Sequence, residues 1–139
     1  RAETYVYLNK ALYNYRIGSG MTGKFDPNYY ESFKVIFEET YHRKKKWNLD
    51  NFDELMAIKV LSTSGRAITQ SRYKKWKNIR EQKDYLKSIC EDMIFIQNLV
   101  YLNRVQKSIQ TDYVILFKLL HKKWYNLVVI LLRIRNIFI

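Results

Sequence analysis

Apolar side chains recur at spacings of three and four residues through most of the chain, which is the period of a helix with one buried face. The first such stripe predicts a helix with Asp26 as its N-cap and Pro27 in the first helical position, ending near His42. Its members are Tyr30, Phe33, Phe37 and Tyr41. No other proline occurs in the chain, so no proline interrupts the later helices.

Two further periodic segments lie in the middle of the chain. A second helix is expected from Asp50 or Asn51 to about Gly65, with acidic residues in its first turn. Its apolar face should hold Phe52, Leu55, Met56 and Leu61. A third helix should begin at Ser71 and extend over residues 71–105, either unbroken or as two helices divided near Gln82.

The last helix is expected to begin at Thr111 or Asp112 and to be basic and amphipathic. Its polar side holds Lys118, Lys122, Asn126, Arg133 and Asn136. Its broad apolar side holds Phe117, Leu120, Trp124, Leu127, Ile130, Leu131, Ile134 and Phe138. Residues 127–139 include two arginines and are too short to span a bilayer, which takes about 20 apolar residues. Two interpretations remain open: the apolar side packs on the other helices, or its end meets lipid or another subunit.

The pattern before the first helix is different. Residues 4–17 carry aromatic side chains at alternate positions, which predicts one β-strand or a bent pair of strands. No second strong strand follows, so the partner strands are expected upstream of Arg1. The fold class is therefore predicted to be mainly α, with a short N-terminal strand followed by four to five helices. Residues 1–24 would end a truncated catalytic domain, and residues 25–139 would form a C-terminal helical domain.

Charge is concentrated in the second half of the chain. The net charge is +12, and residues 71–139 hold fourteen Lys or Arg against five Asp or Glu. No acidic residue follows Asp112. Such a field attracts nucleic acid or the anionic face of a membrane. The single cysteine, Cys90, excludes an internal disulfide and is expected to be a small apolar core residue.

The motifs of common catalytic sites are missing from the sequence. His42 and His121 are isolated, and neither a zinc-ligand spacing nor a nucleophile elbow occurs. The Gly18-Ser19-Gly20 turn lacks the lysine of a Walker phosphate loop. We therefore expect no catalytic residue and no metal site within these 139 residues.

The segment from Leu12 to Thr22 joins the aromatic strand to a glycine-rich turn that carries Arg16, Ser19 and Thr22. Arginine presents planar donors to phosphate oxygens, and glycines allow the backbone to approach an anion. The Tyr13-x-Tyr15-Arg16 strand and its Gly-Ser loop resemble the segment that closes the catalytic domain of bacterial family-two glycosyltransferases.

The resemblance implies an upstream catalytic domain of the GT-A type, an inverting enzyme with a Rossmann-like sheet. Such enzymes bind a nucleotide-sugar through an Asp-x-Asp motif and a divalent metal, Mg or Mn, and the motif is absent here. Arg16, Ser19 and Thr22 would then bind substrate, near the donor diphosphate or the acceptor. The helices would brace the catalytic domain and hold it at the cytoplasmic face of the plasma membrane, where a cell-surface polysaccharide is extended. Membrane-binding residues would be Lys122, Lys123, Trp124, Arg133 and Arg135.

Two other functions compete with this interpretation. The chain could be a helical nucleic-acid-binding module, with Tyr73 and Trp76 stacking on bases. The basic residues of that module would be Arg72, Lys74, Lys75, Lys77 and Arg80. Alternatively, the terminal apolar helix could drive self-association into a homo-oligomer.

Overall fold

The structure is a computed structural model that describes residues 24–135, with the side chains of residues 24–134. These residues form eight α-helices and two short 3-10 segments, Ser71–Tyr73 and Gln106–Ser108. The helices are α1 (Tyr29–His42), α2 (Lys44–Trp47), α3 (Phe52–Gln70), α4 (Ile79–Cys90), α5 (Met93–Leu99), α6 (Leu102–Val105), α7 (Thr111–His121) and α8 (Tyr125–Arg135).

The predicted fold class is wrong in its details. Residues 24–135 contain eight helices where four to five were expected, and they contain no strand. The strand expected over residues 4–17 lies outside the described residues. The extra helices arise because local breaks divide segments whose apolar period looks continuous. The mainly helical character itself is confirmed.

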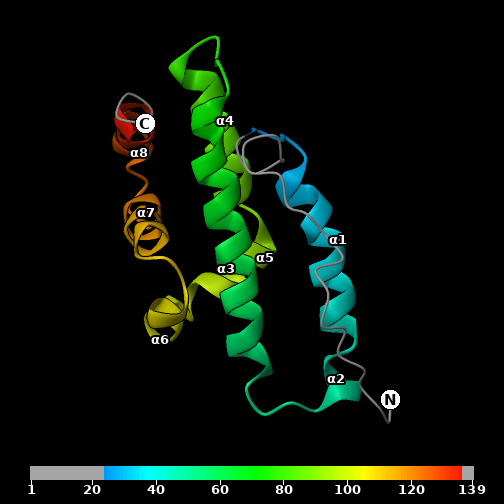
Figure 1. The fold of residues 1–139 in the computed structure, drawn as a ribbon. Coiled ribbons are helices and arrows are strands. Elements are labelled where there is room, and N and C mark those ends of the chain that lie inside the picture. Colours follow the sequence, from blue (N-terminus) through cyan, green and yellow to red (C-terminus); the bar gives the residue numbers. More distant parts are fainter. Residues whose placement is uncertain (1–23, 136–139) are drawn as a thin grey trace, which may run out of the picture.

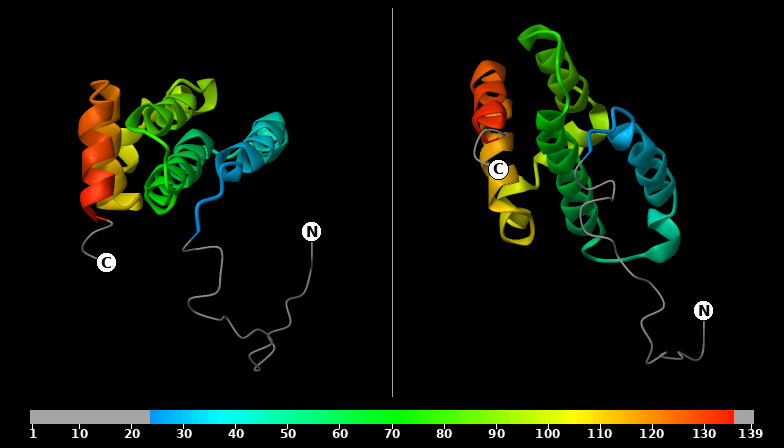
Figure 2. Two further views of the ribbon diagram at one scale, coloured as in Figure 1. Left: turned by 90° about the horizontal axis from the view of Figure 1, so that it is seen from above. Right: turned by 45° about the horizontal axis from the view of Figure 1, so that its top comes forward.

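Helix α3 lies in the middle of the molecule (Figure 1). Helices α1 and α2 lie on one side of it, and α6, α7 and α8 lie on the other. The view from above in Figure 2 shows the same order, with α4 beside α3 and close to α8. The larger apolar cluster joins α3, α4, α5, α7 and α8, and a smaller one fills the space between α1, α3 and α5.

The close approach of α3 and α7 depends on a glycine. A Cβ atom placed on Gly65 would lie 2.3 Å from Cγ of Tyr113 and 2.4 Å from its Cδ2. A contact under 3 Å cannot be tolerated without movement of the ring or of a helix. Glycine therefore sets how closely the α7 side of the molecule packs against the central helix.

Helix α1 is attached to α5 by two polar groups. Asp92, the N-cap of α5, accepts hydrogen bonds from the Ile94 amide at 2.9 Å and from the Tyr30 hydroxyl at 3.1 Å, and it pairs with Lys34. Burial alone would raise the Asp92 pKa, but the Lys34, Ile94 and Tyr30 donors together hold it below its usual value. Asn98 lies nearly two helical turns beyond Asp92, and its side-chain amide exchanges hydrogen bonds with the Tyr41 hydroxyl.

The sequence predicted some of these elements well. Helix α1 ends at His42 as expected, but its N-cap is Asn28 and not the expected Asp26; Asn51 is at the N-cap position of α3. Ser71 begins only the short 3-10 segment Ser71–Tyr73, because α3 continues to Gln70; the N-cap of the next α-helix, α4, is Asn78. Its side chain accepts a hydrogen bond from the Glu81 amide at 2.8 Å. Both expected forms of the third helix, unbroken over residues 71–105 or divided near Gln82, are wrong: Gln82 lies inside α4, and the chain breaks after Cys90, where Asp92 caps α5, and again after Leu99.

Candidate functional site

Helix α8 is apolar on both its inward and its outward side. Its inner face packs against the core and consists of Val128, Val129 and Leu132, each at most 3% exposed. The outer face of α8 is formed by Leu127 (39% exposed), Ile130 (50%), Leu131 (40%) and Ile134 (45%). An apolar helix face is normally covered by the rest of the protein or by a partner. The described residues cover only the inner half.

The inner side of α8 is also held by one polar contact. Arg133 donates from Nε to Oε1 of Gln82 at 3.1 Å. Gln82 is fully buried in α4 and lies 3.5 Å, Nε2 to Oγ, from Ser71. Arg133 is exposed overall, so its Nε anchors the helix while the charged group reaches the surface.

A tight turn separates α7 from α8 and holds three of the predicted membrane-binding residues. The Lys123 amide donates to the Leu120 carbonyl at 2.8 Å, and the Trp124 amide donates to the Leu119 carbonyl at 3.1 Å. This is the Schellman arrangement at a helix end, in which the residue that adopts the left-handed conformation is usually glycine. Here that residue is Lys123, with φ of 59°.

The turn presents basic and aromatic groups together. Lys122 and Lys123 are exposed, and the Lys122 ammonium lies 5.2 Å from the centre of the Trp124 ring. Trp124 is 51% exposed, although a packed position was one expectation for this part of the helix. Because α7 and α8 are separate helices, Trp124 is not in line with the buried Phe117 and Leu120.

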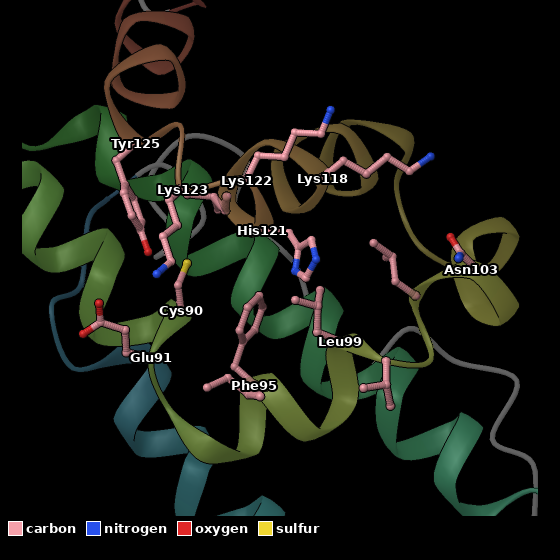
Figure 3. Close-up of a pocket in the computed structure, with 14 residues that line it drawn as sticks. Cys90, Glu91, Phe95, Leu99, Asn103, Lys118, His121, Lys122, Lys123 and Tyr125 are labelled. Atoms are coloured by element: carbon pink, nitrogen blue, oxygen red, sulfur yellow. The ribbon is translucent and has the colours of Figure 1, made fainter.

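A pocket of about 840 Å³ opens beside this turn, between α5 and the end of α7 (Figure 3). Its floor is apolar and includes Phe95, Leu99, Leu102 and Leu120. Its basic side chains are Lys118, His121, Lys122 and Lys123, all from the end of α7 and the turn. Glu91 is the only carboxylate among its described lining residues.

Two ionisable groups at the end of the pocket are neutral at pH 7. Burial, assisted by the charge of Glu91, raises the pKa of Cys90 to about 12. Burial also raises the pKa of the Tyr125 hydroxyl, with smaller contributions from Cys90 and Glu91. The Cys90 thiol is therefore unreactive and behaves as part of the apolar lining.

The structure describes only some of the predicted site residues and places them in two different parts of the molecule. Arg16, Ser19 and Thr22 lie outside the described residues, as does the side chain of Arg135. Lys122, Lys123 and Trp124 are consecutive in the α7–α8 turn, whereas Arg133 lies near the far end of α8. The pocket residues Phe95, Leu99 and His121 were missed, because they come from separate helices and carry no motif.

The basic segment of residues 72–80 is partly occupied by internal contacts. Trp76 donates from Nε1 to the Ser71 carbonyl at 2.7 Å and packs on Phe25 and Tyr85 with ring centres 5.3 and 5.5 Å away. Lys74 pairs with Glu81 at 3.0 Å. Trp76 is thus a structural residue, which removes one of the two stacking groups expected of a nucleic-acid-binding surface. Lys75, Lys77 and Arg80 remain exposed.

Comparisons with other proteins do not place the chain in a family. No protein-family model, curated protein or solved structure matches it significantly. Within residues 24–135, no helix is both long and apolar enough to cross a membrane.

Proposed function

We propose that the helical domain attaches peripherally to an anionic membrane surface through the outer face of α8. The observation that carries this proposal is the exposed row of Leu127, Ile130, Leu131 and Ile134. A contiguous exposed apolar patch of this kind usually marks a contact surface. A helix in the interface lays its apolar face among the acyl chains and keeps cations at the level of the headgroups.

The surroundings of the outer face favour anionic lipid over a second protein copy. Lys122, Lys123 and Arg133 lie at its two ends, and no acidic residue occurs in the chain after Asp112. Two copies meeting through this face would bring these like charges together. Each basic residue near an anionic bilayer contributes about 1 kcal/mol to binding. Trp124 at the start of the face has the side chain that is enriched at membrane interfaces.

Co-sedimentation with vesicles tests this attachment. The chain should bind vesicles that contain phosphatidylserine and should bind neutral vesicles weakly. Raising the salt from 0.1 to 1 M should weaken binding, because the Debye length falls from about 10 to about 3 Å. The triple variant Leu127→Gln, Ile130→Gln and Ile134→Gln should bind more than tenfold more weakly, since each change removes about 1 kcal/mol of apolar burial.

A matched control lies on the opposite side of the molecule. Val35 (67% exposed) and Ile36 (47%) are apolar residues on the surface of α1. The double variant Val35→Gln and Ile36→Gln should bind vesicles as the native chain does. Equal loss in both variants, or a concentration-dependent dimer abolished by the triple variant without any vesicle binding, would contradict the proposal.

On the resemblance of residues 12–22 alone, we extend the proposal to a larger enzyme. The domain would brace the catalytic domain of a glycosyltransferase that uses a nucleotide-sugar and extends a cell-surface polysaccharide. The support for this step is the Tyr13-x-Tyr15-Arg16 and Gly-Ser pattern. The coding sequence upstream of Arg1 tests it: an Asp-x-Asp motif within a strand-rich domain is expected, and a start of the reading frame at Arg1 would contradict it.

A further inference from the structure

The pocket between α5 and α7 differs in shape and chemistry from the outer face of α8. We infer that it binds a single-chain anionic amphiphile, whose hydrocarbon chain lies against Ile96, Leu99 and Val100 and whose phosphate or carboxylate group lies at His121 and Lys123. This goes beyond attachment to a membrane surface, because it concerns one ligand molecule in a defined pocket that is open to solvent on one side. It can hold whether or not α8 binds a bilayer.

The size and floor of the pocket fit a hydrocarbon chain. Its volume of about 840 Å³ lies within the range of about 300–1,000 Å³ that is typical of small-molecule sites. Phe95 is 1% exposed and Leu120 is 3% exposed, so both belong to the rigid core and give the floor a fixed shape. Ile96 lines the pocket from α5 and is 43% exposed, which leaves apolar surface for a ligand to cover.

The charge of the pocket fits an anionic head group. Figure 3 shows the His121 ring and the Lys123 side chain directed into the pocket, while Lys118 and Lys122 extend from its edge. The described lining residues thus include four basic side chains and a single carboxylate, that of Glu91. A purely apolar or a cationic ligand would leave this excess of positive charge without a partner.

The backbone of Lys123 supplies an independent observation. A non-glycine residue in the left-handed region costs about 1–2 kcal/mol, and such strain tends to occur at functional sites. At φ of 59°, Lys123 occupies the position of the Schellman turn where glycine is favoured. Glycine there would relieve the strain but would remove the ammonium group that points toward Cys90 and Glu91 (Figure 3).

Dodecyl phosphate, used below its micelle concentration and without vesicles, is a suitable probe. Calorimetric titration of the whole chain should give saturable binding of one molecule. Each methylene added or removed between octyl and dodecyl phosphate should change the affinity about three- to fourfold. Inorganic phosphate should give no saturable binding, and dodecanol should bind at least tenfold more weakly than dodecyl phosphate. Equal affinity for dodecanol would overturn the assignment of a head-group site.

Two variants locate the ligand. Lys123→Gly should weaken dodecyl phosphate binding about tenfold, because the loss of one hydrogen bond to a charged group lowers affinity by about this factor. Dodecanol binding should stay unchanged. Lys45→Ala removes an exposed lysine from α2 and serves as the charge-matched control. Ile96→Trp adds bulk to the pocket wall and should weaken binding, while its thermal unfolding stays close to that of the native chain. Unchanged dodecyl phosphate binding in either pocket variant would overturn the inference.

The same variants separate this inference from the proposed membrane attachment. Ile96→Trp should sediment with phosphatidylserine vesicles as well as the native chain does. The triple variant of the outer face should keep its affinity for dodecyl phosphate. Vesicle binding without dodecyl phosphate binding would overturn the pocket alone, and the reverse result would overturn the membrane attachment alone.

Discussion

Helices α1 and α8 lie on opposite sides of the central helices (Figures 1 and 2) and differ in how their outward faces are built. Helix α1 carries exposed Glu31, Glu38 and Glu39 beside its few exposed apolar residues. Helix α8 carries Leu127, Ile130, Leu131 and Ile134 outward. The outward face of α1 mixes charged and apolar residues, whereas that of α8 is an apolar surface of the kind that usually marks a contact.

The two helices are also attached differently. Asp92 and Asn98 fix α1 on α5 through directional hydrogen bonds to Tyr30 and Tyr41. Helix α8 is held mainly by buried Val128, Val129 and Leu132. Directional bonds specify one position, and apolar packing supplies most of the attachment free energy. The α1 side is therefore a fixed part of the fold, and the surface that we propose for interaction lies on the α8 side.

The largest expected effect on stability comes from the junction that carries α7 and α8. Gly65→Ala should destabilise the fold by about 2–3 kcal/mol, because overpacking against Tyr113 exceeds the gain in helix propensity. Urea unfolding measures this loss. In a Tyr113→Ala background the same change should cost much less, and an equal cost in both backgrounds would show that the ring is not the obstacle.

A smaller loss is expected on the α1 side. Asp92→Asn should cost about 1–2 kcal/mol, because it removes the charge partner of Lys34 while an amide can still cap α5. The Asp92 pKa is lower in the folded state than in the unfolded state. The ionised carboxylate therefore contributes fully to stability above about pH 4, and this contribution disappears as the pH falls through the pKa of the folded state.

The acid unfolding of that variant provides the check. Asp92→Asn should lose less stability than the native chain between about pH 4 and pH 2. Asp84→Asn, on the exposed side of α4, should unfold in acid as the native chain does. Identical acid profiles for Asp92→Asn and the native chain would contradict the role of the carboxylate.

A gain is expected at the start of α8. Lys123→Gly should stabilise the fold by about 1 kcal/mol, because glycine adopts the left-handed conformation of this turn without steric cost. The change appears as a higher urea midpoint with an unchanged slope. Lys122→Gly replaces a neighbour whose φ of −78° is ordinary, and it should not stabilise. Loss of stability in Lys123→Gly would mean that the lysine makes a structural contact.

The smallest effect should come from the outer face itself. Each of Leu127→Gln, Ile130→Gln and Ile134→Gln should change stability by no more than about 0.5 kcal/mol, since these side chains are 39–50% exposed and lose little burial. Val129→Ala, on the inner face, should cost more than 1 kcal/mol. Thermal unfolding of the single variants distinguishes the two faces. A large loss in the outer-face variants would show that this face supports the fold.

The sequence contained enough information for the first helix and for the helical character of the chain. Tyr30 and Phe37 are buried in α1 as their spacing predicts, with Phe33 and Tyr41 half-buried. Leu55 is exposed although it shares the period of α3, because periodicity does not reveal where neighbouring helices lie. The split at Lys123 was missed because lysine is not the residue that normally marks such a turn.

The candidate site was predictable only in part. Lys122, Lys123 and Trp124 stood out as basic and aromatic neighbours, and the structure places them in one exposed turn. The pocket was not predictable, since Phe95 and His121 are brought together only by the packing of α5 against α7. Such a meeting of distant residues leaves no pattern in a single sequence.

Quenching of tryptophan fluorescence by brominated lipids tests most directly whether the α8 side faces the membrane. Trp124 in the α7–α8 turn and Trp47 at the end of α2 are similarly exposed, at 51% and 45%, and lie on opposite sides of the molecule. Vesicles containing brominated chains should quench the native protein and the Trp47→Phe variant strongly, and the Trp124→Phe variant weakly. Strong quenching that survives Trp124→Phe and disappears in Trp47→Phe would contradict the account.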